Sequence, residues 1–265
     1  MAEMKYDIVI QGGQSNAEGT GYGEVTRELT RSPNVWYLEA EKTVEVIDNR
    51  LCVTYAEKPF AILPAEERIG ENGMTVGDFS LTFAEAYERA GLLRKDRNLL
   101  IVRAGVGGAG FMKKFWGVGN MLHNKLVDMV DYALSLNKEN RVVGFLWHQG
   151  EHDAFEKNDP EVFKAQLTAT VEDIRTRYGK DLPFIAGDFA NEWKNDNIED
   201  CRPIVAKIRE TIGEVGNAAF VETSDLPTNN QKIGNGDTVH FCRESLHILG
   251  RRYFNAYQEL IVNKK

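Results

Sequence analysis

Short apolar segments alternate with amphipathic helical patterns along most of the chain. Each apolar segment is rich in β-branched or aromatic residues and is bounded by glycine, asparagine or charge, which is typical of strands buried on both faces. Such an alternation implies a parallel sheet with helices on both faces, because parallel neighbours need crossover connections. We therefore expect an α/β fold with a mostly parallel five-stranded sheet. Its predicted strands are residues 6–11, 98–103, 142–147, 183–187 and 218–221.

Five helices are predicted between and after these strands. The pattern over residues 160–178 has clear end signals, with Asp159 as N-cap, Pro160 at the first helical position and Gly179 just past the end. Residues 20–74 are less regular, and we interpret them as an excursion with small strands inside a single domain of residues 1–265. The other predicted helices are residues 79–90, 121–136, 198–212 and 244–262.

Length and charge exclude several classes of protein. A chain of 265 residues can form one large domain that buries about three quarters of its unfolded surface, so no disulfide or metal is needed for stability. Lys and Arg number 32 against 40 Asp and Glu, a net charge of −8. An acidic surface without a basic run repels nucleic acid and anionic lipid, so neither is an expected partner. No apolar run approaches the ~20 residues of a membrane span.

Cysteine usage and the start of the chain favour a cytoplasmic location. Cys52, Cys201 and Cys242 are odd in number, widely spaced and form no CxxC pair, as expected of reduced thiols. The first residues pass from a charged tripeptide directly into a predicted strand, without the apolar region of a secretory signal. The sequence does not determine the oligomeric state.

The residues that follow the predicted strands are the candidates for chemistry, because sites in such sheets lie beyond the carboxyl ends of the strands. After the first strand comes Gly12-Gly13-Gln14-Ser15-Asn16-Ala17, a glycine-rich turn that can hold the Ser15 hydroxyl above the sheet edge. It is not a GxSxG elbow, because residue 17 is alanine. Taken alone, a serine in such a turn also fits simple turn chemistry.

The loop after the second strand, residues 104–110, matches the GxGxxG dinucleotide fingerprint. That fingerprint should open a helix directly, but here more glycines follow without a cap. Acidic residues ~20 positions on fall inside a helical pattern instead of at a strand end. We therefore expect these glycines to bring a backbone N–H close to a reacting oxygen.

The third strand is followed by His148-Gln149-Gly150-Glu151-His152, which matches the HxxEH pattern of inverted zinc proteases. A zinc site would need both histidines on one helical face. A strand runs into this segment and Gly150 lies inside it, so we expect the histidines on a loop and no metal. Near the end of the chain, Asp237 precedes His240 by three residues. Such an Asp can reach the imidazole Nδ1–H and leave Nε2 free to deprotonate a hydroxyl.

Together these segments resemble the SGNH-hydrolase superfamily, and more narrowly its sialate O-acetylesterase and acetylxylan esterase branch, carbohydrate esterase family six. The matches run in order between residues 7 and 257, nearly the whole chain. They are GQSN at 13–16, the Gly107-Gly108 pair, QGE at 149–151 with Asp153 after it, DxxHF at 237–241 and a GRRY-like turn at 250–253.

The resemblance implies a flavodoxin-like, three-layer α/β/α fold and a serine esterase that removes acetyl groups from sugars. By this resemblance Ser15 is the nucleophile, His240 the general base and Asp237 its orienting acid. The implied oxyanion donors are the N–H of Ser15, the N–H of Gly108 or Gly107, and the Gln149 side chain. Gln14, Asn16 and Glu151 support the site. The chain departs from the family at Ala109, where Thr or Ser is usual, and at His152, where Ser is common. Either change can alter the acyl or sugar pocket.

The expected chemistry is consistent with the residues themselves and needs no cofactor. Ester hydrolysis requires an activated hydroxyl, a base and donors for the developing oxyanion. The expected substrate is a small acetylated carbohydrate, of acetylxylan or sialic-acid type. The alternative is an inactive carbohydrate-binding module on the same fold. Three tryptophans in or near the loops fit either sugar stacking or loop packing: Trp116, Trp147 and Trp193.

Overall fold

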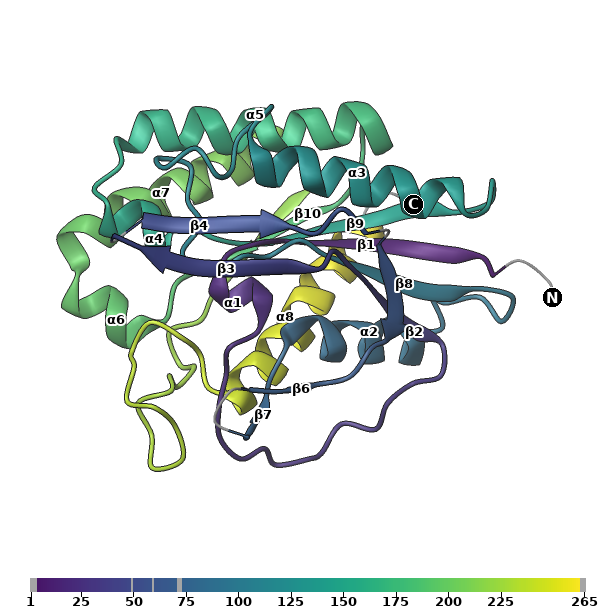
Figure 1. Ribbon diagram of the computed structural model, residues 1–265, viewed down its shortest axis with the longest axis horizontal. Coiled ribbons are helices and arrows are strands. Elements are labelled where there is room, and N and C mark those ends of the chain that lie inside the picture. The colour runs from purple at the N-terminus through teal and green to yellow at the C-terminus, as the bar shows by residue number, and fades with distance from the viewer. Residues whose placement is uncertain (1–3, 49, 59, 71–72, 263–265) are drawn as a thin grey trace.

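A seven-stranded sheet forms the centre of the molecule in the computed structural model, which describes residues 4–262 except 49, 59, 71 and 72 (Figure 1). Residues 1–3, part of the charged start before the first predicted strand, lie outside the residues that the structure describes. The strand order is β11-β10-β9-β1-β8-β2-β5. Its five predicted strands are confirmed and pair in parallel: β1 (Tyr6–Gly13), β8 (Asn98–Arg103), β9 (Arg141–His148), β10 (Phe184–Gly187) and β11 (Ala218–Val221).

The prediction of five strands in this sheet is wrong, because two more strands come from the 20–74 excursion. β2 (Val35–Glu39) pairs in parallel with β8, and β5 (Ala61–Pro64) pairs antiparallel with β2 at the sheet edge. These strands are short, and β5 is only half-buried and ends in proline, which an edge strand tolerates. β2 has an apolar run, Val35 to Leu38, but it lies in a segment without the regular strand–helix alternation that identifies the other five strands.

The rest of the excursion forms two small antiparallel hairpins outside the main sheet. One pairs β3 (Lys42–Ile47) with β4 (Arg50–Tyr55), and the other pairs β6 (Arg68–Ile69) with β7 (Thr75–Val76). Lys42 at the start of β3 reaches the loop after β8, where its Nζ donates to the Gly105 carbonyl at 2.7 Å. The β3–β4 hairpin therefore contacts the carboxyl edge of the sheet.

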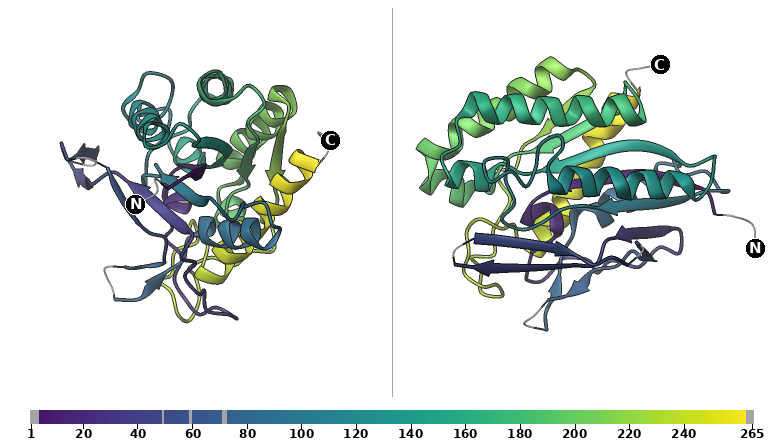
Figure 2. Two further views of the ribbon diagram at one scale, coloured as in Figure 1. Left: turned by 90° about the vertical axis from the view of Figure 1, so that its right-hand side faces the viewer. Right: turned by 45° about the horizontal axis from the view of Figure 1, so that its top comes forward.

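Helices cover both faces of the sheet and give three layers (Figure 2). Side chains of β1 alternate between the faces: Ile8 and Ile10 belong to the core on one side, and Val9 to the core on the other. The first face is covered by α3 (Met121–Ser135), α5 (Pro160–Tyr178) and α7 (Ile198–Val215), and the second by α2 (Phe79–Arg89) and α8 (Arg243–Val262).

The five predicted helices are present, and α5 has the predicted ends. The Asp159 carboxylate accepts from the backbone N–H of Glu161 and Val162, which satisfies two N–H groups that lack partners inside the helix. Three short helices were not predicted: α1 (Ser15–Glu18), α4 (Glu151–Phe155) and α6 (Asn191–Asp196). Each follows directly after a sheet strand or its loop and is too short to show a periodic pattern.

Two further expectations concern the whole chain. None of the helices that the structure describes has the length and apolar character needed to cross a membrane. Cys52, Cys201 and Cys242 are all free thiols, and the last two are buried.

Candidate active site

The turn after β1 places Ser15 at the carboxyl edge of the sheet, as the first residue of α1. Gly13 has φ of +131°, and a Cβ there would lie 2.1 Å from the His148 carbonyl oxygen. Only glycine fits this close approach between the ends of β1 and β9. The next residue, Gln14, donates its backbone N–H to the same His148 carbonyl at 2.9 Å. The glycine predicted from the sequence therefore fixes where the chain turns into Ser15.

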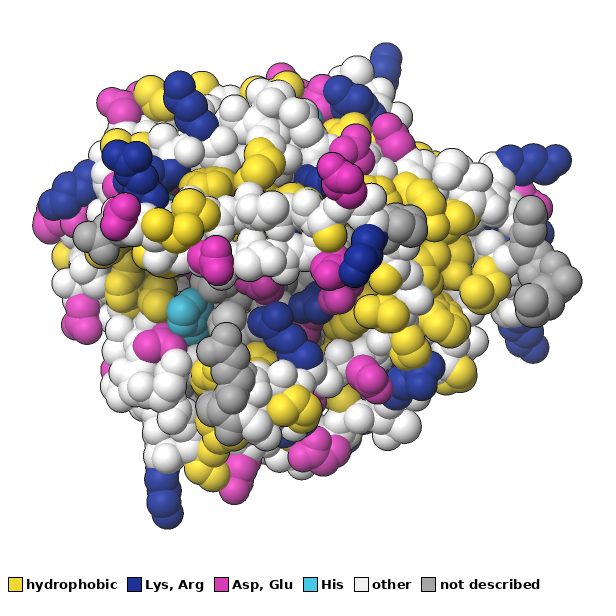
Figure 3. All heavy atoms as spheres, viewed as in Figure 1, with side chains coloured by type: hydrophobic (Ala, Val, Ile, Leu, Met, Phe, Trp, Pro, Cys, Tyr) yellow, Lys and Arg dark blue, Asp and Glu magenta, His cyan; other side chains and the backbone are white. Residues whose placement is uncertain are grey.

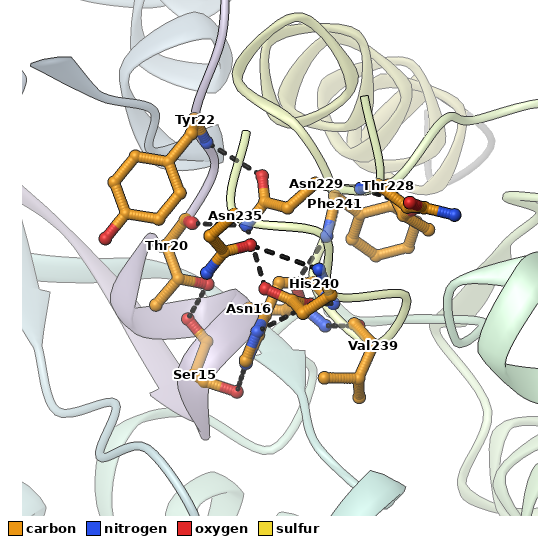
Figure 4. Close-up of polar contacts among 12 residues, drawn as sticks. Ser15, Asn16, Thr20, Tyr22, Thr228, Asn229, Asn235, Val239, His240 and Phe241 are labelled. Carbon is orange, nitrogen blue, oxygen red and sulfur yellow. Dashed lines mark hydrogen bonds and ion pairs between the residues drawn. The ribbon is translucent and has the colours of Figure 1, made fainter. Parts of the chain in front are cut away.

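Two hydrogen bonds join Ser15 to His240 and His240 to Asp237; Figure 4 shows the Ser15 and His240 side chains. The Ser15 Oγ lies 2.7 Å from His240 Nε2, and His240 Nδ1 lies 3.0 Å from Asp237 Oδ1. The same Asp237 oxygen accepts the backbone N–H of His240 at 2.8 Å. Two contacts from one residue to one oxygen fix both the loop and the ring. A serine and a histidine that are 225 residues apart in the sequence are thus in direct contact.

The charge state of Asp237 determines which imidazole nitrogen carries the proton. Burial alone would raise the pKa of this carboxyl, but its hydrogen bonds and charge interaction with His240 lower the pKa to about 2. An ionised carboxylate can only accept, so the neutral imidazole carries its proton on Nδ1. Nε2 is then an acceptor and faces the Ser15 hydroxyl as a base.

Asn229 holds the other side of Asp237 and was not predicted from the sequence. Its Nδ2 lies 3.3 Å from Asp237 Oδ2 and 2.9 Å from the Thr20 carbonyl, and its Oδ1 accepts the Tyr22 N–H (Figure 4). Asn229 is fully buried. Its place in a polar loop segment, Thr228-Asn229-Asn230-Gln231, gives no signal that distinguishes it from ordinary turn residues.

Backbone N–H groups of the expected oxyanion site differ in availability. Gly107 N–H donates to Glu18 Oε2 at 2.9 Å, so it is already bonded. Within the described part of the chain, the N–H groups of Ser15 and Gly108 make no hydrogen bond. Ser15 N–H is free because the first N–H groups of a helix have no partner within it. Gly108 has φ of +70°, a conformation that favours glycine.

The Gln149 side chain is fully buried and already makes hydrogen bonds within the protein. Its Nε2 donates to Asp153 Oδ2 at 2.5 Å and lies 3.5 Å from Gln14 Oε1, while its own Oε1 is buried without a hydrogen bond among the described residues. The Gln14 oxygen also accepts the His152 N–H at 3.1 Å. One strong and one long contact therefore occupy the two amide protons of Gln149.

Asn16 and Glu151 connect α1 to the loop that carries His240. Asn16 Nδ2 donates to Glu151 Oε1 at 2.8 Å and to the Val239 carbonyl at 3.1 Å, and its Oδ1 accepts the Phe241 N–H (Figure 4). Asn16 thus bonds the residues on both sides of the histidine. Burial alone would raise the pKa of Glu151, but His148 and Asn16 lower it below the usual value.

The HxxEH and GxGxxG matches both lie at the ends of sheet strands, after β9 and β8. Strand β9 continues to His148 and α4 begins at Glu151, so His152 lies on a short helix, and its prediction on a loop is wrong. The histidines still share no helix, and His148 Nδ1 contacts the Tyr253 hydroxyl at 3.0 Å. In the described residues no three His, Cys, Asp or Glu side chains are grouped to hold a metal ion. The loop after β8 opens no helix before Met121.

A hollow of about 520 Å³ opens above the Ser15–His240 pair, and apolar atoms form most of its surface. Of the three tryptophans, only Trp193 lines it. Trp116 and Trp147 are fully buried, where they pack edge to face with ring centroids 4.9 Å apart. Trp116 and Trp147 are therefore packing residues of the core and not sugar-stacking residues. The substituted residue His152 lines the hollow, whereas Ala109 is buried.

Comparison with known protein families gives a match that includes all of these site residues. The family described as "Carbohydrate esterase, sialic acid-specific acetylesterase" matches residues 5–259, nearly the whole chain. The chain belongs to this family. The resemblance to this family that the short sequence motifs indicate is confirmed.

Two curated relatives of this acetylesterase-family chain match it over short stretches. One, "Endo-1,4-beta-xylanase A" of Thermoanaerobacterium saccharolyticum, is 30% identical over 91 residues, which are 30% of this chain and 8% of the relative. The other, "Probable 9-O-acetyl-N-acetylneuraminic acid deacetylase" of Escherichia coli, is 25% identical over 115 residues, 40% of this chain and 35% of the relative. The matches thus span well under half the length of either relative.

Solved structures share the fold of this family member. NanS superimposes with a TM-score of 0.74 at 17% identity, over 99% of both chains. A protein from Arabidopsis thaliana gives 0.65 at 19% identity, over 96% of this chain and 98% of its own. A carbohydrate acetylesterase from Xanthomonas citri gives 0.63 at 17% identity, over 97% of this chain and 56% of its own. At such identities the likeness establishes the three-layer α/β/α architecture.

Proposed function

We propose that the protein is a serine esterase that removes O-acetyl groups from a carbohydrate through an acyl-enzyme intermediate. The observation that carries the proposal is the 2.7 Å contact between Ser15 Oγ and His240 Nε2, with Asp237 on the far side of the ring. Family membership supports the reaction class, and the relatives' names support acetylated sugars of sialic-acid or xylan type as substrates.

In the proposed reaction Ser15 Oγ attacks the acetyl carbonyl carbon while His240 Nε2 takes the hydroxyl proton. The carbonyl oxygen becomes an oxyanion that accepts from the N–H groups of Ser15 and Gly108, which are free of other hydrogen bonds in the described chain. Collapse of this intermediate breaks the bond to the sugar oxygen, and His240 returns the proton to that oxygen. Water then attacks the acetyl-serine with the same base, and acetate leaves.

Gln149 is the proposed third oxyanion donor. Its contact with Gln14 is long at 3.5 Å, so that amide proton can be redirected at little energetic cost. Asp153 accepts the other proton and sets the orientation of the amide. Gln14 and Asn16 are proposed to support the site through the contacts described above.

We further propose that residues 1–265 act as one catalytic domain in the cytoplasm. The 20–74 excursion supplies two strands to the main sheet, which favours one structural unit. Three free cysteines favour a reducing compartment. An inactive sugar-binding module is the alternative, but such a module has no need for a serine, a histidine and an aspartate in contact.

The test is acetate release from a panel of acetylated xylo-oligosaccharides and acetylated sialic acids, with the Ser15→Ala variant as control. The wild type should release acetate and react once with a serine-directed phosphonate at Ser15, whereas Ser15→Ala should fold normally and do neither. p-Nitrophenyl acetate should give a burst of chromophore followed by slower turnover. A label on another residue, or unchanged activity in Ser15→Ala, would refute the proposal.

A further inference from the structure

A carboxylate lies directly beside the proposed oxyanion site. Glu18 ends α1, and its side chain lines the same hollow as Ser15 and His240. Its Oε2 accepts the Gly107 N–H at 2.9 Å. A Cβ built on Gly107 would lie 3.4 Å from this oxygen and 3.6 Å from Ser15 Cβ, which shows how closely the carboxylate, the glycine turn and the nucleophile approach one another.

A negative charge at this place opposes the reaction unless it is balanced, because an oxyanion develops next to it. Glu18 Oε1 lies 3.0 Å from Lys42 Nζ, the first residue of the β3–β4 hairpin, and both side chains are largely buried. Arg68 is more exposed and lies farther away, at 3.9 Å. Lys42 is therefore the principal counter-charge. Figure 3 shows basic and acidic side chains next to one another in the hollow beside a histidine.

The pKa of Glu18 agrees with an ionised pair. Burial alone would raise this pKa, but the charge and hydrogen bond of Lys42 and the hydrogen bond from Gly107 lower it below the usual glutamate value. Burial lowers the pKa of Lys42, and Glu18 opposes that shift. Lys42 also donates to the Gly105 carbonyl at 2.7 Å, so it contacts the loop after β8 as well as Glu18.

We propose that Glu18 and Lys42 are positioning residues of the esterase. Glu18 holds the Gly107-Gly108 turn by its bond to the Gly107 N–H, which leaves the Gly108 N–H as the donor to the oxyanion, and Lys42 cancels the charge of the carboxylate. The inference rests on the proposed esterase function. It also gives the β3–β4 hairpin a part in the reaction, although that hairpin lies outside the main sheet.

The two roles predict a pattern of rates that a plain structural ion pair does not give. Glu18→Gln keeps an oxygen that can accept the Gly107 N–H, so kcat should change by less than about threefold. Glu18→Ala removes the acceptor, and kcat should fall by about tenfold or more with KM little changed, because the oxyanion donor is misplaced. Lys42→Met leaves Glu18 charged and unbalanced, so kcat should fall by a similar factor.

The double variant Lys42→Met/Glu18→Gln is the decisive measurement. Removal of the carboxylate charge should restore kcat to within about threefold of Glu18→Gln, because no charge is left to oppose the oxyanion. If the pair is only structural, the double variant should be no faster than Lys42→Met. Double-mutant coupling of this sign isolates the interaction between the two side chains.

Lys58→Met is the matched control. Lys58 forms an ion pair of the same 3.0 Å length with Glu41, but both side chains are exposed. Its loss should leave kcat unchanged. Rates are divided by the folded fraction from a thermal melt, so a Lys42→Met variant with a lower melting temperature and normal kcat overturns the inference. A wild type without acetate release refutes the esterase itself, whereas an active wild type with no recovery in the double variant refutes only the positioning role.

Discussion

The proton that leaves Ser15 in the proposed mechanism needs one particular imidazole tautomer, and Asp237 selects it. Asp237→Asn keeps the shape of the acid but allows the amide to donate to Nδ1, which stabilises the wrong tautomer. We expect kcat to fall by up to ~10⁴ while the melting temperature changes little. Steady-state kinetics with p-nitrophenyl acetate measure the loss.

Glu151→Gln is the informative comparison for that variant, since Glu151, like Asp153, is a buried acid of α4 beside the turn. It contacts Asn16 and not His240, so a smaller loss is expected. An almost normal rate in Asp237→Asn together with an inactive Glu151→Gln would mean that the acid of the triad is Glu151.

Steady-state kinetics and a thermal melt of Gln149→Ala distinguish a catalytic role of Gln149 from a structural one. A donor that meets charge only in the transition state should cost ~10²–10³ in kcat when removed, with KM little changed. A buried structural amide should instead cost about 1–3 kcal/mol of unfolding free energy, because its hydrogen bond to the buried Asp153 carboxylate is lost. For Gln149→Ala we expect the loss of kcat. Normal kcat with a much lower melting temperature would remove Gln149 from the oxyanion site.

Sequence motifs locate the residues of the proposed triad but not the residues that hold them in place. Ser15, Asp237 and His240 follow from motif order, and the structure brings them into contact. Asn229 and Glu18 act through tertiary hydrogen bonds to Asp237 and Gly107, and neither belongs to a recognisable pattern. The choice between Gly107 and Gly108 likewise depends on the Glu18 side chain, which no spacing rule places.

At the scale of elements, α1 and the loop of residues 236–242 must be held together for the site to exist. Asn16 makes this connection through the Val239 carbonyl and the Phe241 N–H. Asn16→Ala should therefore lower kcat by roughly 10–10²-fold, because a displacement of ~1 Å between base and nucleophile has effects of that size. Phosphonate labelling of Ser15 should slow in parallel. Asn255→Ala, at an exposed position of α8, serves as control, and an equal loss there would contradict the role of Asn16.

Helices and strands can be predicted from the sequence where capping residues or apolar runs coincide with buried positions. The ends of α5 follow from Asp159, Pro160 and Gly179, and the central strands follow from their apolar runs. Small strands are expected in the 20–74 excursion, but the sequence does not show that β2 and β5 join the main sheet, where β2 pairs with β8 and β5 pairs with β2. Which strand pairs with which is decided by tertiary contact, and a local sequence pattern indicates it only weakly.

At the scale of the whole molecule, the proposed active site and a buried ion-pair cluster around Asp7 lie at opposite ends of the central strands. Asp7 lies near the start of β1 with no exposed surface, and it accepts from Arg97 and Arg141 at 2.7 Å and from the Tyr87 hydroxyl at 3.0 Å. These contacts join β1 to β9 and to the residue before β8, at the end of the sheet away from Ser15.

Asp7→Asn should destabilise the fold without changing kcat. Loss of one partner leaves the buried Arg97 without its counter-charge, which costs about 3 kcal/mol or more. Burial alone would raise the pKa of Asp7, but Arg141 and Arg97 lower it, so the folded carboxyl has a lower pKa than the unfolded one. Its stabilisation is present above the ordinary aspartate pKa and is lost as the pH falls.

Urea unfolding of wild type and Asp7→Asn therefore checks both parts of this prediction. The difference in unfolding free energy should be largest at neutral pH and should shrink below about pH 4. Asp96→Asn, which removes an exposed acid beside Lys5 and Arg94, should have little effect at any pH. A difference for Asp7→Asn that does not vary with pH would show that the charge of Asp7 is not what stabilises the sheet.

The contact between Ser15 and His240 spans 225 positions, and this separation orders events during translation. At about 5–20 residues per second, roughly 10 s or more pass between synthesis of the nucleophile and synthesis of its base. During that interval the nascent chain contains a serine with no base to activate it. On the proposed mechanism, the growing polypeptide cannot hydrolyse an ester while most of its sheet is being made, and activity becomes possible only after His240 has been added.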